Sequence, residues 1–290
     1  MEALHASNLF SVNGLVAVIT GGGTGIGLMM TKALAANGAH KVYIVGRRKE
    51  KLDEAASHAP EIIVPVVGDV TSKDSLKSIA AQIKSEVGYL NLLVCNSGMM
   101  GPQIPVKAAE ASVSAYAAAA LDMAWDENVQ TFATNSVSPL YTTFAFLELL
   151  DGGNKKGNRI GTKSQVLITS SIAGFLRTPG LSYAYGMSKA ATTHLTKQLC
   201  STLVPFDIRV NALAPGLFPS DLAAGLISNA KKDPTEEGAF EKSYIPAERT
   251  GKESDMGGTV LYMASQAGAY LNGVIVVIDG GRLAGLPTTY

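Results

Sequence analysis

A tyrosine and a lysine stand four residues apart in the second half of the 290-residue chain, at Tyr185 and Lys189. Side chains with this spacing share one face of a helix. A phenol has an ordinary pKa of about 10, and a neighbouring ammonium favours the phenolate and lowers that pKa. The pair is therefore typical of a proton carrier, although Tyr-x-x-x-Lys alone occurs often by chance. Tyr183 has Met187 four residues further on and does not compete for this role.

A serine precedes this pair in a position that suits a hydroxyl donor. Ser171 lies fourteen residues before Tyr185 and follows the apolar run Val166–Ser170. Open parallel sheets bind ligands at the carboxyl ends of their strands, and a hydroxyl at such an end can hold a carbonyl oxygen. The alternative is an ordinary turn serine, which is otherwise the commoner case.

A glycine-rich segment, Thr20–Gly27, follows the first apolar run and leads at once into a helical segment. Glycines let the backbone turn tightly and approach a pyrophosphate closely. The helix N-terminus then offers free N–H groups and a partial positive charge. A plain tight turn is the alternative, but a strand before the glycines and a helix after them favour a dinucleotide.

The end of the second apolar run bears on the choice of dinucleotide. An acidic residue there would bind a ribose 2′-hydroxyl and favour NAD, whereas this sequence has Gly46, Arg47 and Arg48. Arginine forks suit a 2′-phosphate, so we expect NADP (NADPH), with NAD the less favoured cofactor. A solvated basic turn is the alternative, and Thr24 supplies no basic residue within the glycine motif.

Elements that could position these groups alternate along the chain as apolar runs and helix-length segments. This order indicates parallel strands joined by right-handed crossovers, with helices on both faces. We therefore expect an α/β fold of the Rossmann type, doubly wound on a mostly seven-stranded parallel sheet, with residues 1–290 as one domain. The expected strands are Val16–Thr20, Val42–Val45, Ile62–Val67, Leu92–Cys95, Val166–Ser170, Ile208–Leu213 and Val274–Ile278.

Helices and one loop are expected between these strands. Gly25–Asn37 and Lys49–His58 are helical, and the first ends near Gly38. A capping-box pattern at Thr71 and Asp74 opens a helix that runs to about Val87. The Ala-rich stretch Ala108–Ala120 is expected to be helical. Asp151–Lys163 is rich in Gly, Asn and Lys, which is typical of a surface loop.

Composition narrows the class of partner. The 24 Lys and Arg balance 24 Asp and Glu, so there is no electrostatic case for nucleic acid. No stretch has the apolar length that spans a membrane, and Met1–Gly14 has no secretory pattern. Cys95 and Cys200 are far apart and suit a cytoplasmic, reducing setting. The four histidines have no metal-ligand spacing, so no metal is expected.

Taken together, the motifs resemble those of the classical short-chain dehydrogenase/reductase family, and the resemblance runs from about Leu9 to Gly281. Two further stretches, Leu213–Ser220 and Gly280–Leu283, are similar to a fungal-type branch. One departure is Cys95-Asn96-Ser97-Gly98, where the family usually has Asn-Asn-Ala-Gly. The motifs, in chain order, are Thr20-Gly21-x-x-x-Gly25-Ile26-Gly27, Asn96-Ser97-Gly98, Ser171, Tyr185-x-x-x-Lys189 and Pro215-Gly216.

The resemblance implies how a cofactor would lie. The four motif residues Gly21, Gly25, Ile26 and Gly27 would line its pyrophosphate. Asp69 and Val70 would meet the adenine, Asn96 and Gly98 would flank a ribose, and Ser220 would contact the nicotinamide amide. The full expected cofactor set is Gly21, Thr24, Gly25, Ile26, Gly27, Arg47, Asp69, Val70, Asn96, Gly98, Tyr185, Lys189, Pro215, Gly216 and Ser220.

The resemblance also implies the chemistry. Nicotinamide would deliver hydride to a ketone, Ser171 would hold its oxygen and Tyr185 would protonate it. Lys189 would bind the nicotinamide ribose and keep the pKa of Tyr185 low. Asn135 is implied as a fourth catalytic residue that binds a water next to Lys189. The alternatives are a catalytically lapsed binding protein and a redox-neutral enzyme such as a lyase or epimerase.

Two segments are expected to close the substrate pocket: Gly216–Ile245 and the stretch between Gly98 and Asn135, which is longer than usual for the family. Apolar residues in the first segment suggest a small lipophilic or cyclic ketone or alcohol, unless they pack as an ordinary flap; they are Leu217, Phe218, Leu222, Leu226, Ile227 and Phe240. The resemblance further suggests a homotetramer or homodimer formed through the helices that contain Asn135 and Tyr185. Ala184, Ala190 and Ala191 would permit close helix contact there, or would meet their own sheet.

Overall fold

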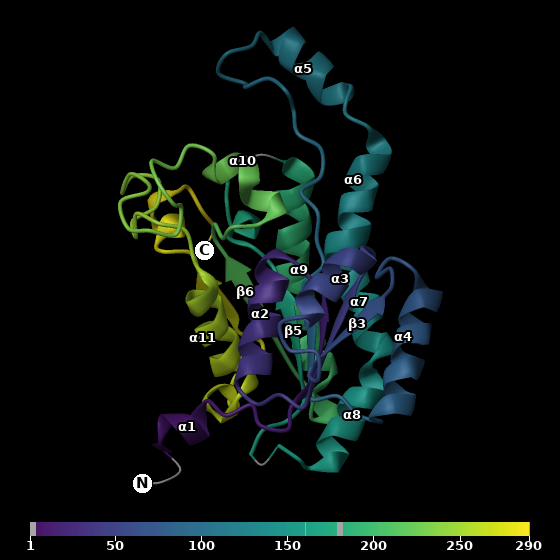
Figure 1. Ribbon diagram of the computed structural model, residues 1–290. Helices are drawn as coiled ribbons and strands as arrows, with labels where there is room; N and C mark the ends of the chain where they lie inside the picture. Colours follow the sequence, from purple (N-terminus) through teal and green to yellow (C-terminus); the bar gives the residue numbers. More distant parts are fainter. Residues whose placement is uncertain (1–3, 160, 179–181, 290) are drawn as a thin grey trace.

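The computed structural model describes residues 4–159, 161–178 and 182–289. Its seven strands form one parallel sheet in the order β3-β2-β1-β4-β5-β6-β7 (Figure 1), which confirms the predicted fold class. Each predicted strand is present, with ends that differ by at most two residues. The strands are β1 (Val16–Thr20), β2 (Lys41–Gly46), β3 (Ile63–Val67), β4 (Leu92–Cys95), β5 (Gln165–Thr169), β6 (Arg209–Pro215) and β7 (Ile275–Ile278).

The central strands are buried on both faces, because successive side chains point to opposite sides and helices cover each side. In β1, Ala17 and Ile19 join a core with α2, α3 and α11. Val16 and Val18 join the second core, with α4, α8 and α9 on the other face. The principal helices are α2 (Gly25–Ala36), α3 (Lys49–Ala56), α4 (Lys73–Glu86), α6 (Trp125–Phe132), α7 (Ser138–Ala145), α8 (Leu147–Lys156), α9 (Tyr183–Thr202) and α11 (Glu253–Ala264). No helix among the described residues is long and apolar enough to cross a membrane.

The predicted surface loop over Asp151–Lys163 is wrong in its first half, because α8 continues to Lys156. Tertiary packing overrides the weak helix propensity of its glycines. An added Cβ on Gly153 would lie 2.1 Å from the Leu90 carbonyl oxygen, so a glycine lets this helix approach β4. The helix ends at Gly157, whose φ of +63° is the left-handed conformation common after a helix.

Two helix starts also differ from prediction. Ser72, and not Thr71, caps α4, because its Oγ accepts from the Ser75 N–H at 3.2 Å. The Thr71 hydroxyl instead donates to Asp69 at 2.7 Å. The helix predicted over Ala108–Ala120 is α5 (Val113–Leu121), which begins after the capping Ser112.

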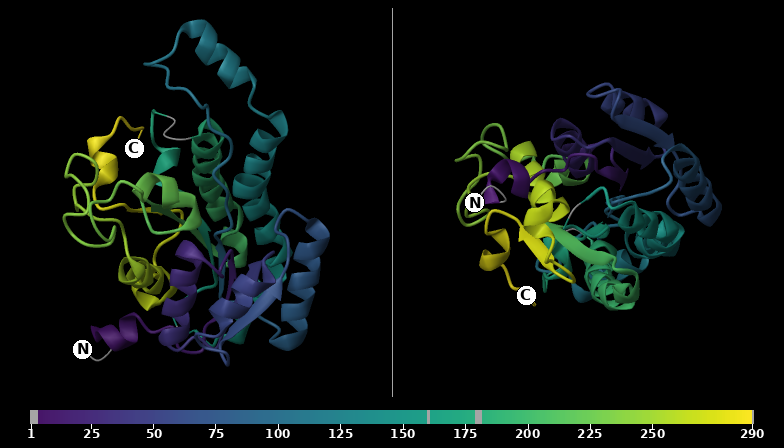
Figure 2. Two further views of the ribbon diagram at one scale, coloured as in Figure 1. Left: turned by 45° about the horizontal axis from the view of Figure 1, so that its top comes forward. Right: turned by 90° about the horizontal axis from the view of Figure 1, so that it is seen from below.

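The segment that carries α5 projects from the body of the molecule as an arm. Figures 1 and 2 show α5 at the far end of this arm, with α6 leading back toward the sheet. None of the α5 residues is buried. Three large apolar side chains, Val113, Leu121 and Trp125, are at least 80% exposed. The arm therefore gains little of its stability from the core.

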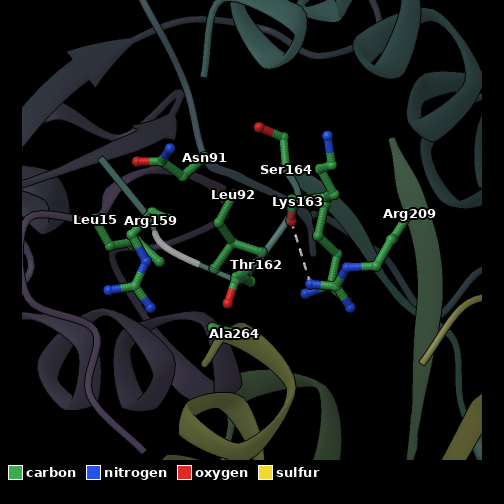
Figure 3. Close-up of a pocket in the computed structure, with 10 residues that line it drawn as sticks. Leu15, Asn91, Leu92, Arg159, Thr162, Lys163, Ser164, Arg209 and Ala264 are labelled. Carbon is green, nitrogen blue, oxygen red and sulfur yellow. Dashed lines mark hydrogen bonds between the residues drawn. The ribbon is translucent and has the colours of Figure 1, made fainter. Parts of the chain in front are cut away.

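A buried polar cluster lies at the amino ends of the central strands, at the edge of the sheet opposite the predicted site (Figure 3). The guanidinium of Arg209 donates to the Gln165 side chain at 3.1 Å and to the carbonyls of Gly268 and Leu271 at 3.0 Å. Burial lowers the pKa of Arg209 to about 10. The cavity here is about 10 Å³, so the cluster fastens β5 and β6 and leaves no room for a ligand.

Candidate active site

A cleft of about 610 Å³ opens at the carboxyl ends of the strands. Parallel strands bring the segments that follow them to one edge, so groups distant in sequence meet there. Every residue of the predicted site lines this cleft except Gly27 and Asn135, which lie behind its wall.

The glycine-rich turn between β1 and α2 is shaped for close approach to a phosphate. Gly21 and Gly25 have φ values of +67° and +52°, where a side chain would be strained. A Cβ on Gly27 would lie 2.1 Å from the Gly21 carbonyl oxygen, so only glycine lets the helix start this near the turn. The resulting cradle of backbone N–H groups at a helix N-terminus fits a pyrophosphate.

Asn96 braces this turn from the end of β4. Its Nδ2 donates to the carbonyls of Thr20 and Gly21 at 3.1 and 3.3 Å. Its backbone N–H donates to the Thr20 hydroxyl at 2.9 Å. Asn96 therefore couples β4 to the phosphate turn in addition to facing the cleft.

Basic side chains gather where β2 ends. Arg47, Arg48 and Lys51 line this part of the cleft. Arg48 reaches across it, with its guanidinium 3.4 Å from the Thr24 hydroxyl and 3.5 Å from an Asp221 carboxylate oxygen. These cations would surround a group held beyond the phosphate turn.

Asp69 and Val70 line the same end of the cleft, after β3. The Asp69 carboxylate accepts from the Thr71 N–H at 2.9 Å and from its hydroxyl at 2.7 Å. These two bonds, with a smaller contribution from the Arg47 charge, lower the pKa of Asp69. The carboxylate thus shapes the turn and stays ionised.

Tyr185 and Ser171 face each other across the other end of the cleft. Ser182 caps α9 by accepting from the Tyr185 N–H at 3.3 Å, which places the tyrosine in the first turn. Burial raises the pKa of the phenol, and a hydrogen bond from Ser171 opposes this rise. In the protein without cofactor, Tyr185 is therefore a protonated phenol, in contrast to the lowered pKa that its spacing from Lys189 suggested.

Lys189 is a buried ammonium one helical turn beyond Tyr185. Its Nζ donates to the Thr169 carbonyl at 2.7 Å and lies 5.7 Å from the centre of the Tyr185 ring. Burial lowers its pKa to about 8. Gly98 lies beside this nitrogen, since a Cβ on Gly98 would stand at an ordinary contact distance of 3.7 Å from it.

Asn135 lies in a π-helical turn, η2 (Ala133–Val137), between α6 and α7. Such turns interrupt α-helices at functional sites more often than elsewhere. Its Oδ1 accepts from the Met99 N–H at 2.9 Å, and its Nδ2 donates to the Met99 carbonyl at 2.9 Å and to the Ser188 hydroxyl at 3.0 Å. The side chain that was expected to hold a water is thus bonded to protein groups. It connects the segment that follows β4 to α9.

The end of the cleft near Tyr185 is mostly apolar. The long segment after Gly98 contributes Met99, Met100, Gln130 and Thr134 to the lining. The segment Gly216–Ile245 contributes Leu217, Phe218, Leu222 and Leu226 to the lining of the cleft. Two predicted pocket residues do not line it, because Phe240 and Ile227 pack with Ile245 and Tyr244 in a small separate core.

Several residues of the site have no counterpart in the sequence prediction, and three of them bear on the chemistry. Thr169 acts through its backbone carbonyl, which no side-chain pattern reveals. Ser188 lies inside the Tyr-x-x-x-Lys spacing, and its contact with Asn135 depends on tertiary packing. Arg282 lines the cleft and belongs to the Gly280–Leu283 stretch, which had been noted without a role.

Comparisons with known proteins identify the family of the chain. The short chain dehydrogenase family model matches residues 15–231. The chain is 48% identical to the short-chain dehydrogenase/reductase PhomF of Diaporthe leptostromiformis (99% of this chain, 98% of that protein) and 42% identical to VdtF of Byssochlamys spectabilis (100% and 99%). A solved RhlG/NADP active-site complex of Pseudomonas aeruginosa superposes with a TM-score of 0.75 at 27% identity (95% of this chain, 98% of that chain). The chain belongs to the short-chain dehydrogenase/reductase family.

Proposed function

We propose that this protein is an NADP(H)-dependent oxidoreductase that interconverts a ketone and a secondary alcohol. The observation that carries the proposal is the convergence of Ser171, Tyr185 and Lys189 at one end of a cleft whose other end is a glycine turn flanked by arginines. A proton donor, an oxygen-binding hydroxyl and a dinucleotide cradle in one cleft are what carbonyl reduction needs.

The side chains divide the work on the carbonyl oxygen. When bound, the reduced nicotinamide supplies a hydride to the carbonyl carbon. Ser171 donates a hydrogen bond to the oxygen as negative charge develops on it, and Tyr185 transfers its phenolic proton there to complete the alcohol. The raised pKa of Tyr185 keeps that proton available at neutral pH. In the oxidising direction, Tyr185 would take the proton back.

Lys189 would hold the nicotinamide ribose and supply positive charge beside the phenolate that remains after proton transfer. Its nitrogen is already directed by the Thr169 carbonyl. Asn135 supports this arrangement without contacting the substrate, because it is bonded to Met99 and to Ser188, the neighbour of Lys189 in the chain.

The preference for NADP over NAD rests on charge. Arg47, Arg48 and Lys51 line the adenosine end of the cleft. A planar guanidinium can bind a phosphate through two parallel hydrogen bonds. The structural relative from Pseudomonas aeruginosa is an NADP complex, which supports the same choice here.

A second copy of the chain is the expected partner, as a homodimer or homotetramer, in a cytoplasmic setting. Five exposed apolar side chains form an outer stripe along α6, η2 and α7: Trp125, Val129, Val137, Tyr141 and Phe144. The π turn takes up one extra residue, which brings the members before and after it to the same side of the helix. Tyr183 and Met187 on α9 are exposed as well.

A panel of cyclic and aromatic ketones, assayed optically with NADPH and with NADH, tests the function. We expect turnover with a higher kcat/KM for NADPH. Tyr185→Phe should lower kcat by about 10²- to 10⁴-fold, the usual contribution of general acid catalysis, while NADPH binds with unchanged affinity.

The matched control is Tyr183→Phe, two residues away on the same helix and without a role in the proposed chemistry. Turnover that survives in Tyr185→Phe would remove the assignment of the proton donor. Tight NADPH binding without oxidation of NADPH by any ketone of the panel would instead favour a lapsed or redox-neutral member of the family.

A further inference from the structure

Arg282 is a cation in the cleft that the proposed reaction does not use. Within residues 4–159, 161–178 and 182–289 no carboxylate pairs with its guanidinium. Its Nε is buried and has no hydrogen-bond partner in that part of the chain. The buried Nε atoms of Arg159 and Arg209 also have no partner. What distinguishes Arg282 is that its guanidinium lines the ligand cleft while no carboxylate of the described residues neutralises its charge, so a bound anion would be its partner.

The turn that presents Arg282 is rigid. Gly280 and Gly281 both adopt left-handed backbone conformations, with φ values of +62° and +83°. The Asp279 carboxylate accepts from the Gly281 N–H at 2.9 Å and from the Leu283 N–H at 2.6 Å. The backbone on both sides of Arg282 is therefore held by one carboxylate.

The side chain is held as firmly as the turn. The Arg282 guanidinium lies 4.2 Å from the centre of the Tyr244 ring. Tyr244 in turn donates from its hydroxyl to the Leu226 carbonyl at 3.2 Å, and its ring contacts Phe240 at a centroid distance of 5.7 Å. Stacking occupies a face of the guanidinium but none of its N–H groups, which lie in the plane. An acceptor in that plane would meet a preorganised donor.

Arg282 lies far along the sheet edge from the arginines that are proposed to bind the cofactor. Arg282 follows β7, whereas Arg47 and Arg48 follow β2, and four strands lie between. Asp279, which fixes the Arg282 turn, packs so closely on Gly216 that a Cβ there would lie 2.7 Å away. Tyr244, which stacks on Arg282, is bonded to Leu226 in the apolar part of the cleft, so the guanidinium borders that part.

We propose that Arg282 binds a carboxylate of the substrate, so that the preferred substrate is an apolar keto acid or hydroxy acid whose carbinol or carbonyl group faces Tyr185. The inference rests on the proposed function for the reacting group, but the carboxylate site is separate from it. A carboxylate matches the planar fork of a guanidinium, and the apolar Leu222 and Leu226 line the same cleft. The apolar wall alone would accept neutral ketones equally well.

Two pairs of aromatic ketones test the carboxylate site. Each pair is an acid and its methyl ester, 4-acetylbenzoate and the longer 5-oxo-5-phenylpentanoate, reduced with NADPH. For at least one pair we expect kcat/KM to favour the acid by about tenfold or more, the usual effect of a hydrogen-bonded charged group. Arg282→Gln should abolish this acid-to-ester preference, and Arg282→Lys should restore part of it.

The matched control is Arg177→Gln, which removes an exposed arginine that does not line the cleft and should leave the preference intact. A wild-type enzyme that treats acid and ester alike, or an Arg282→Gln variant that retains the acid preference, would overturn the proposal.

A binding measurement keeps this proposal distinct from the proposed function. The NADPH-loaded Tyr185→Phe variant is titrated calorimetrically with each acid and ester, with and without Arg282→Gln. Selective binding of an acid that is lost with Arg282 supports the carboxylate site even if no ketone is turned over. Equal binding of acid and ester, or no loss on removal of Arg282, refutes the site whatever the activity of the enzyme.

Discussion

Lys189 combines a charge with almost complete burial, at 3% exposure. Burial disfavours the charged form, which is why its pKa falls to about 8. A shift of this size corresponds to about 3 kcal/mol of folding free energy at neutral pH. The protein therefore carries a destabilising group at the point where positive charge would serve a phenolate, as active sites often do.

Replacing Lys189 by Met should inactivate the enzyme and stabilise the cofactor-free fold. At pH 7 we expect a gain of roughly 2 kcal/mol, because removal of the buried charge outweighs the loss of one hydrogen bond to Thr169. Between pH 8 and 10.5 the folded wild type loses this proton before the unfolded chain does, so its own stability rises with pH. The advantage of Lys189→Met in thermal melts should shrink across that window.

Lys197→Met is the control for this experiment. Lys197 also donates from α9 to a backbone carbonyl, that of Gly273, but its side chain is exposed. Its removal should not raise the melting temperature. If Lys189→Met melts below the wild type at pH 7, the hydrogen bond to Thr169 outweighs the desolvation of the charge and this account of Lys189 is wrong.

At the scale of elements, the π turn η2 places Asn135 where its side chain connects two parts of the site. Asn135→Ala would remove three hydrogen bonds and leave both backbone groups of Met99 without their partner. We expect a loss of about 2 to 3 kcal/mol in the free energy of unfolding, with kcat falling more than the KM for NADPH rises.

Asn135→Asp tests the same bonds with a side chain of similar size. It retains an acceptor for the Met99 N–H, but it loses the two donated bonds and sets a buried carboxylate against the Met99 carbonyl oxygen, so at neutral pH its stability should fall below that of Asn135→Ala. Thermal melts and steady-state kinetics measure both effects. An Asn135→Ala variant with wild-type stability would show that these bonds do not brace the site.

Most strands were predictable because helices cover both faces of the central sheet, so those strands are nearly continuous apolar runs, although β6 includes the buried Arg209 and Asn211. The α8 helix was not predictable, since the fit of Gly153 against Leu90 is a contact between distant segments. The start of α4 was missed by one residue because Thr71 and Ser72 are both good caps, and the Asp69 carboxylate engages Thr71 first.

In the candidate site, too, features set by local sequence were predictable and contacts between distant segments were not. Tyr185, Lys189 and the glycine turn were predictable because their chemistry follows from residue type and local spacing. The partners of Asn135 were not, since Met99 and Ser188 come from other elements. Arg282 has no local spacing to any reactive residue, and its relevance emerges only when β7 is placed at the sheet edge that borders the substrate.

At the scale of the whole molecule, the outer stripe is an apolar surface that a monomer would leave in water. Large exposed apolar patches commonly mark protein interfaces. We expect the wild type to assemble as a dimer or tetramer, and the double variant Val129→Arg with Phe144→Arg to be monomeric, because each added charge would be desolvated without a partner. Light scattering after gel filtration measures the masses.

Tyr270→Arg provides the comparison, since Tyr270 is a fully exposed aromatic residue outside the stripe. That variant should assemble as the wild type does. A wild type that stays monomeric at tens of micromolar, or a double variant that still assembles, would place the interface elsewhere or show that none forms.

The strand order has a consequence for how this fold can diverge. Five inter-strand steps separate β2 from β7, which is roughly 24 Å at the usual spacing. Substitutions that far apart usually combine additively. With the proposed roles of Arg282 and Arg47, natural variation after β7 would alter the acid or ketone that is accepted while the segment after β2 keeps its cofactor contacts, and descendants of one ancestor would acquire new substrates without changing their source of reducing equivalents.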